Sequence, residues 1–148
     1  MNKKVRNLSI LVIVLAIISL AMGIVFIQQG YAKEAFLINA MKQEQITITG
    51  VDGIVDNAQK AQIAGDTVRE HRHSIAPTYG DLLGGQQYDP TDPTQLTYAQ
   101  ALNLENYLYL AVASFGVFQV VKATGAFMVL MALALGAVGF ALLSIARS

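Results

Sequence analysis

The sequence predicts an all-α membrane protein in which two transmembrane helices flank a helical extracytoplasmic domain. Three observations lead to this fold class. Hydrophobic residues make up 54% of the chain and charged residues only 14%. Two long apolar segments lie toward the ends, and the acidic residues are gathered between them. A composition of this kind departs from that of a soluble domain, and 148 residues leave room for one compact unit at most.

The first element is an apolar run behind a basic start. Residues 8–27 carry no charge and follow the sequence KKVR. About 20 apolar residues are enough to cross a bilayer. A cleavable signal peptide has a shorter apolar core, of about 7–15 residues. We therefore predict a cytoplasmic basic end at 1–7 and an uncleaved transmembrane helix over 8–28.

A helical extracytoplasmic domain is predicted over residues 29–121. The first helix continues to about Gln45, where the glycines of TGVDG break it. Asp56 is the predicted N-cap of a second helix, which ends before Pro77. One face of this second helix carries small or apolar side chains at intervals of three and four residues. These positions are Ala61, Ala64, Val68, His71 and Ile75.

A loop over residues 76–96 separates the second helix from the last one. It holds all three prolines of the chain, and its Asp-Pro pairs at Asp89 and Asp92 are typical of turns. The next helix is predicted to open at Thr97.

The last segment is too long for one span. Residues 107–145 contain a single charge, Lys122. In the favoured arrangement Lys122 marks the outer membrane boundary, residues 122–146 form the second transmembrane helix, and 147–148 are a cytoplasmic end. Residues 108–121 are apolar on every side of a helix, so the helix over residues 97–121 needs cover from the chain and from a partner. The alternative has three spans, with a tight turn at 122–125.

The charge distribution predicts the topology. All ten acidic residues lie between Glu34 and Glu105, and residues 33–105 carry a net charge of −5. The remaining bases are Lys3, Lys4, Arg6, Lys122 and Arg147. Basic ends and an acidic middle predict two cytoplasmic termini. We predict no nucleic-acid partner, because the acidic middle carries no basic face or motif.

Small residues within the two spans predict close helix packing. In the first span Ser19 and Gly23 are four residues apart. In the second span Ala132 and Gly136 have the same spacing, and Gly139 follows them. Such spacings let membrane helices approach one another.

Few residues suggest chemistry. The chain has no cysteine, which excludes disulfides and thiolate metal sites. Glu70 and His73 share a helix face and are weak candidates for metal ligands; di-iron bundles use this pair twice, and here it occurs once. A solvated helix end, with Arg69 and Arg72 pairing with Glu70, is the favoured interpretation. We predict no enzyme activity, no cofactor and no metal.

Aromatic side chains near the start of the last segment are the predicted interaction residues. A protein interface or an aromatic belt at the membrane surface is favoured over a site for quinone, pigment or lipid. The residues are Tyr98, Tyr107, Tyr109, Phe115 and Phe118.

The runs VREHRHSIAPTYGDLL and PTQLTYAQALNLENYLYLAVASFG resemble a group of uncharacterised bacterial integral membrane proteins. This resemblance implies a bacterial inner membrane and carries no activity with it.

The expected function is that of a small accessory or structural subunit of a bacterial membrane complex, which contacts other integral membrane protein subunits or a second copy of itself, and the lipid bilayer. One alternative is a self-assembling pore or transport component. A second is a membrane subunit that binds a cofactor or metal.

Overall fold

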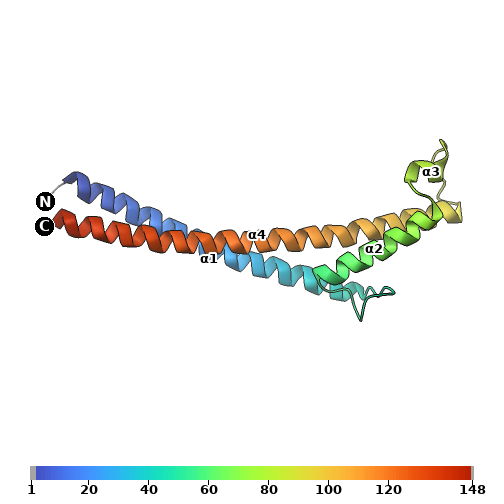
Figure 1. Ribbon diagram of the computed structural model, residues 1–148, viewed down its shortest axis with the longest axis horizontal. Helices are drawn as coiled ribbons and strands as arrows, with labels where there is room; N and C mark the ends of the chain where they lie inside the picture. The colour runs from blue at the N-terminus through green and yellow to red at the C-terminus, as the bar shows by residue number, and fades with distance from the viewer. Residues whose placement is uncertain (1–2, 148) are drawn as a thin grey trace. The chain divides into compact units, whose positions relative to one another are not determined.

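The computed structural model describes residues 3–147, and within this range it is helical and contains no strand. The helices are α1 (Lys3–Glu44), α2 (Ala58–Ile75), α3 (Tyr79–Leu83) and α4 (Pro93–Arg147) (Figure 1). The chain divides into two compact units, where its length predicted one at most. We call residues 3–34 together with 117–147 the apolar helix pair, and residues 35–116 the α2 unit. The all-helical fold class is confirmed.

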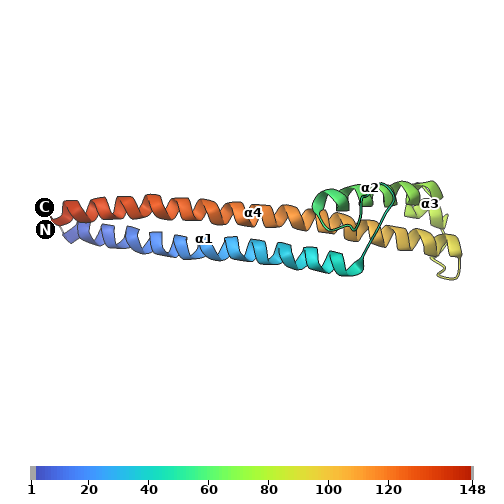
Figure 2. The same cartoon turned by 90° about the horizontal axis from the view of Figure 1, so that it is seen from below.

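In the apolar helix pair, α1 and α4 run antiparallel. Ser9 Oγ donates to the Gly139 carbonyl oxygen at 2.7 Å, and Ser19 Oγ donates to the Met128 carbonyl oxygen at 2.9 Å. Residue numbers therefore fall along α4 as they rise along α1, and the start of α1 lies beside the end of α4 (Figures 1 and 2). Buried small residues recur every seven positions on both helices, and we call them the small-residue seam. They are Ser9, Ala16, Gly23 and Gly30 on α1, and Gly125, Ala132, Gly139 and Ala146 on α4.

Two glycines of the seam bring the helix backbones into contact. A Cβ on Gly23 would lie 2.8 Å from the Gly125 carbonyl oxygen, and a Cβ on Gly125 would lie 2.7 Å from the Gly23 carbonyl oxygen. Any larger residue would push the helices apart. The predicted four-residue spacing is wrong for Gly136, where an added Cβ would meet no atom within 4 Å. The period is seven, which keeps one face of each helix on the other when the pair coils left-handed.

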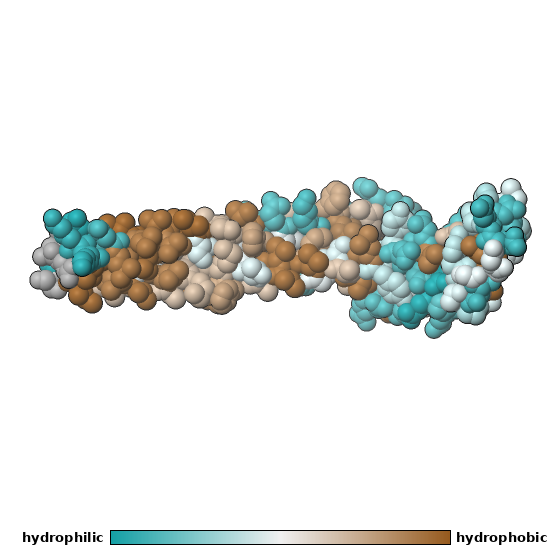
Figure 3. Space-filling model, turned by 90° about the horizontal axis from the view of Figure 1, so that it is seen from above, coloured by the Kyte–Doolittle hydropathy of each residue, from teal (hydrophilic) through white to brown (hydrophobic). Residues whose placement is uncertain are grey.

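Away from the seam, the apolar helix pair presents large apolar side chains outward. Eleven of them lie on α1 between Leu8 and Val25, each 38% to 62% exposed. In water this exposure would cost on the order of 10 kcal/mol. Only 11% of the most apolar stretch of each helix is buried, which a core helix of a soluble protein does not show. Figure 3 shows the resulting apolar surface of the helix pair in brown.

Among residues 3–147, two helices are therefore long and apolar enough to cross a membrane, α1 and α4. The turn that a third span requires is not formed, because α4 continues through residues 122–125 without a break.

In the α2 unit, α2 is capped by Asn57 rather than by Asp56. The Asn57 backbone is extended, and its side chain accepts the Lys60 N–H at 2.9 Å. This bond satisfies a backbone donor that the first turn of a helix leaves free. The predicted cap, Asp56, instead pairs with Lys60 Nζ at 3.3 Å. The helix ends at Ile75, before Pro77 as predicted.

The segment 76–96, predicted as a loop, contains α3 and the first residues of α4. α4 begins at Pro93, four residues before the predicted start at Thr97. Asp92 explains the difference, because its Oδ1 accepts the N–H groups of Thr94 at 2.8 Å and Gln95 at 3.1 Å. Proline is well suited to the first helical position that follows such a cap.

The core of the α2 unit lies where α2, α4 and the segment after α1 meet. Two alanines of α2, Ala61 and Ala64, are completely buried there. Small side chains at these positions let α2 approach its neighbours closely. The buried cluster consists of Val55, Ala61, Ala64, Val68, Leu108 and Ala111. Leu37 and Met41 of α1 pack against it.

The small-residue seam makes a testable prediction. Gly125→Ala places a methyl group within 2.7 Å of the Gly23 carbonyl oxygen, so it should destabilise the helix pair by about 1–3 kcal/mol. Gly136→Ala is the matched control, because the same methyl group meets open space. Thermal unfolding of both variants in detergent measures the difference. Equal unfolding temperatures for the two variants would show that the backbones are not in contact.

Candidate functional site

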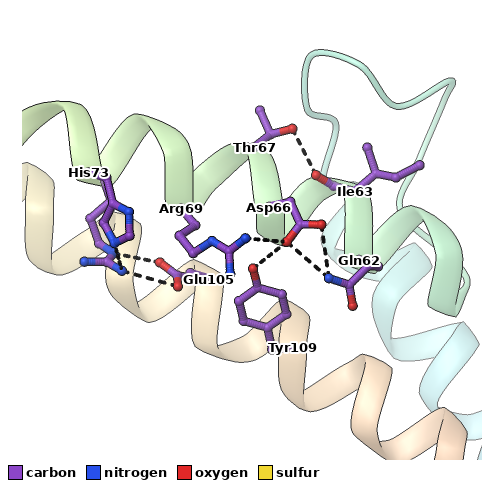
Figure 4. A network of polar contacts seen from close by, with 9 residues as sticks. Gln62, Ile63, Asp66, Thr67, Arg69, His73, Glu105 and Tyr109 are labelled. Carbon is purple, nitrogen blue, oxygen red and sulfur yellow. Dashed lines mark hydrogen bonds and ion pairs between the residues drawn. The ribbon is translucent and has the colours of Figure 1, made fainter. Parts of the chain in front are cut away.

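The α2 unit contains two groups of polar side chains that join α2 to α4 (Figure 4). In the first group, Arg72 Nε donates to Glu105 Oε2 at 2.6 Å and its second nitrogen, NH2, donates to Glu105 Oε1 at 3.4 Å. The two side chains are 10% and 8% exposed. The hydrogen bond to Glu105 raises the pKa of Arg72 above its ordinary value. Arg72 and Glu105 thus form a buried, bidentate ion pair between α2 and α4.

Tyr98 completes the first group. Its ring is fully buried, its hydroxyl oxygen accepts a hydrogen bond from Arg72 NH1, and the guanidinium carbon lies 5.0 Å from the ring centroid. The ring of Tyr79, from α3, lies 6.0 Å from that of Tyr98. Arg72 therefore joins α2 to α4 at two residues, and the Tyr98 ring brings α3 beside them.

The second group is centred on Asp66. Tyr109 Oη donates to Asp66 Oδ1 at 2.7 Å, and Gln62 Nε2 donates to both carboxylate oxygens at 3.1 Å. Arg69 NH2 lies 3.2 Å from Asp66 Oδ1. The hydrogen bond from Tyr109, then that from Gln62, lowers the pKa of Asp66. Burial and the bond to Asp66 raise the pKa of Tyr109 to about 12.

These polar groups use their hydrogen-bonding capacity on each other. Within residues 3–147, every buried side-chain nitrogen or oxygen has a partner. A tyrosine that ionises near pH 12 is a poor acid or base at neutral pH. The geometry therefore fits the attachment of α2 to α4 better than the binding of a ligand.

The weak metal candidates lie near this network without forming a site. His73 Nε2 lies 3.1 Å from Arg72 NH2, which can only donate. Glu70 is exposed, and the expected pairing of Arg69 and Arg72 with it is wrong: Arg69 pairs with Asp66, and Arg72 with Glu105. In the described part of the chain, no three His, Cys, Asp or Glu side chains group in a way that could hold a metal ion.

The five predicted interaction residues fall in different environments. Tyr98 is fully buried, Phe115 is 7% exposed, and Tyr107 is 63% exposed. Tyr109 is partly buried beside Asp66. Phe118 belongs to the apolar helix pair and is also partly buried. Tyr107 thus presents the largest exposed aromatic surface of the five.

Tyr107 borders an apolar groove between the end of α1 and α4. The groove has a volume of about 560 Å³. Its lining includes Leu37, Ala40, Met41, Leu104, Leu110 and Ala111, and Glu44 is the charged residue among those that line it. Phe36 lies one helical turn before Ala40 on α1 and is 73% exposed. We call the groove with Phe36, Tyr107 and Leu110 the apolar surface of the α2 unit.

Lys122, predicted at the membrane boundary, is held within the apolar helix pair. Its Nζ donates to Glu34 Oε2 at 2.8 Å and lies 4.7 Å from the ring centroid of Tyr31. Gly30 makes room for it, because a Cβ there would lie 2.5 Å from Lys122 Cγ. Gln119 Nε2 also reaches Glu34, at 3.5 Å. Lys122 therefore belongs to a polar cluster shared by α1 and α4.

Sequence reasoning did not find the Arg72–Glu105 pair or the groove. The predicted stripe of α2 included His71 and Ile75, yet the buried position is Arg72. A signal was present, because Arg72 follows Val68 by four residues, and Glu105 lies between Ala101 and Leu108 at helical spacing. A charge at a core position of each of two helices indicates a buried pair.

Comparison with known proteins finds no protein family, no curated protein and no solved structure that matches this chain. The resemblance to a group of bacterial membrane proteins stays a prediction.

The Arg72–Glu105 pair makes a second prediction. Glu105→Ala leaves the guanidinium buried without its counter-charge and should cost about 3–5 kcal/mol of stability. Glu70→Ala removes an exposed carboxylate and should change stability by less than about 0.5 kcal/mol. The double variant Arg72→Met/Glu105→Leu should recover most of the loss, because no charge is then buried. Thermal unfolding in detergent compares the three proteins, and equal stability of the two alanine variants would refute the role of the pair.

Proposed function

We propose that this chain is a small accessory or structural subunit of a membrane protein complex, and that it acts through the α2 unit. The apolar surface of the α2 unit carries this proposal. Phe36, Tyr107 and Leu110 are each more than 60% exposed and stand beside a groove with apolar walls. Exposed aromatic side chains next to a concave apolar surface are typical of protein interfaces.

The proposed topology places the α2 unit on the outer side of a bacterial inner membrane. The start of α1 and the end of α4 lie side by side, and their basic residues face the cytoplasm. These residues are Lys3, Lys4, Arg6 and Arg147. At the other end of the pair, Lys122 and Glu34 mark the outer boundary. Between these limits residues 8–28 of α1 supply about 31 Å of helix, which matches the hydrocarbon thickness.

Labelling of single cysteines tests this topology, since the chain has none of its own. A thiol reagent that cannot cross the bilayer should label His71→Cys in intact cells, because His71 is an exposed residue of α2. The matched variant Asn7→Cys, also at an exposed position, should react only after the cells are permeabilised. The reverse pattern would place the α2 unit in the cytoplasm.

The pore alternative has less support. Four polar side chains of the spans were available to line a channel: Ser9, Ser19, Thr124 and Ser144. Both Ser9 and Ser19 donate to carbonyl oxygens of α4. These two hydroxyls therefore stabilise the helix pair instead of facing an aqueous path.

The mass of the protein in mild detergent tests the proposed function. The wild-type chain should elute in a particle whose protein mass exceeds the 15.9 kDa of one chain. Leu110→Glu should weaken this association at least tenfold, because a buried unpaired carboxylate costs more than about 1.4 kcal/mol. His71→Glu, at an exposed position of α2, is the matched control and should behave as wild type. A wild-type protein mass of one chain would refute the proposal.

A further inference from the structure

The apolar surface of the α2 unit needs a specific occupant. Fully covered aromatic side chains bury about 150–250 Å² each, so Phe36, Tyr107 and Leu110 together offer on the order of 350 Å². That is nearly half of the roughly 800 Å² that each partner buries in a standard protein interface. The walls of the groove add to this area. The surface is large enough for a stable contact with another protein.

Lipid does not suit this surface. Glu44 lines the groove, and its carboxylate is the charged group there. Hydrocarbon around a carboxylate or an ammonium group costs several kcal/mol. A protein partner can supply a hydrogen-bond donor or a positive charge for Glu44.

The surface is complementary to itself. It carries projecting side chains, Phe36 and Leu110, and a groove of the same apolar chemistry that can receive them. An interface with two-fold symmetry requires this combination, because one patch supplies both partners of every contact.

A shared membrane restricts the geometry further. Two copies with the same orientation in one bilayer are related by an axis along the membrane normal, so their α4 helices run parallel. Tyr107, Leu110 and Ser114 follow one another at intervals of three and four residues on α4 and all border the groove. This is the spacing with which two parallel helices pack.

We propose that a second copy of this chain covers the apolar surface of the α2 unit, with α4 packed in parallel on α4 and Leu110 close to the partner's Leu110. The proposal rests on the proposed function and names its partner. Each copy then places Phe36 in the groove of the other.

Disulfide cross-linking of single-cysteine variants in native membranes tests the proposal. A disulfide requires Cα atoms within about 7 Å, and only residues beside the two-fold axis bring identical positions so close. Leu110→Cys should therefore give a disulfide-linked homodimer on mild oxidation. His71→Cys, on the exposed side of α2, is the control and should give about a tenfold smaller linked fraction. Leu110 is 61% exposed, so the smaller cysteine leaves the fold intact.

The outcomes separate the two proposals. A linked species of twice the chain mass from Leu110→Cys, reduced when Phe36→Ser is added, supports the second copy. Linkage no greater than that of His71→Cys overturns it. If the protein then still elutes with a mass above one chain, the proposed function stands with a different partner; if it elutes as one chain, both proposals fall.

Discussion

The close approach of α1 and α4 is the constraint on which the apolar helix pair depends. Inside a bilayer, lipid tails are as apolar as the helices, so apolar surface alone does not hold the two together. The contact relies on backbone proximity at Gly23 and Gly125 and on the hydroxyl bond from Ser9 to the Gly139 carbonyl oxygen. The large side chains are left free to face outward.

The α2 unit is stabilised in a different way. Ala61 and Ala64 bring α2 close to its neighbours, and the remaining space at the far end of α2 is filled by a buried ion pair, Arg72 with Glu105. Such a pair gains little net stability over an apolar one, but it penalises other alignments that would leave either charge alone. The polar contacts thus favour one alignment of α2 on α4, while the apolar surface on the other side remains available.

Much of the fold could be predicted from the sequence. Helices were predictable because Pro77 and the glycines of residues 49–53 act locally. The seam was not, since four-residue spacings of small residues are common in membrane helices, and one helix does not reveal which of its faces meets a neighbour. The groove was also beyond prediction, because its walls come from α1, the segment after it and α4. Tyr98 was predicted as an interaction residue, yet its hydroxyl and ring are occupied by Arg72.

A seam that repeats every seven residues does not by itself fix the register of the two helices. Small residues of α1 also meet small residues of α4 when one helix slides along the other by seven residues. Gly23 would then lie opposite Ala132, whose methyl group would hold the backbones further apart than Gly125 does but would still be small. The polar cluster of Lys122, Glu34 and Tyr31 removes this ambiguity, because it occurs once in the helix pair. A slide of seven residues would leave an ammonium group and a carboxylate without each other. The cluster therefore fixes the register of α1 on α4.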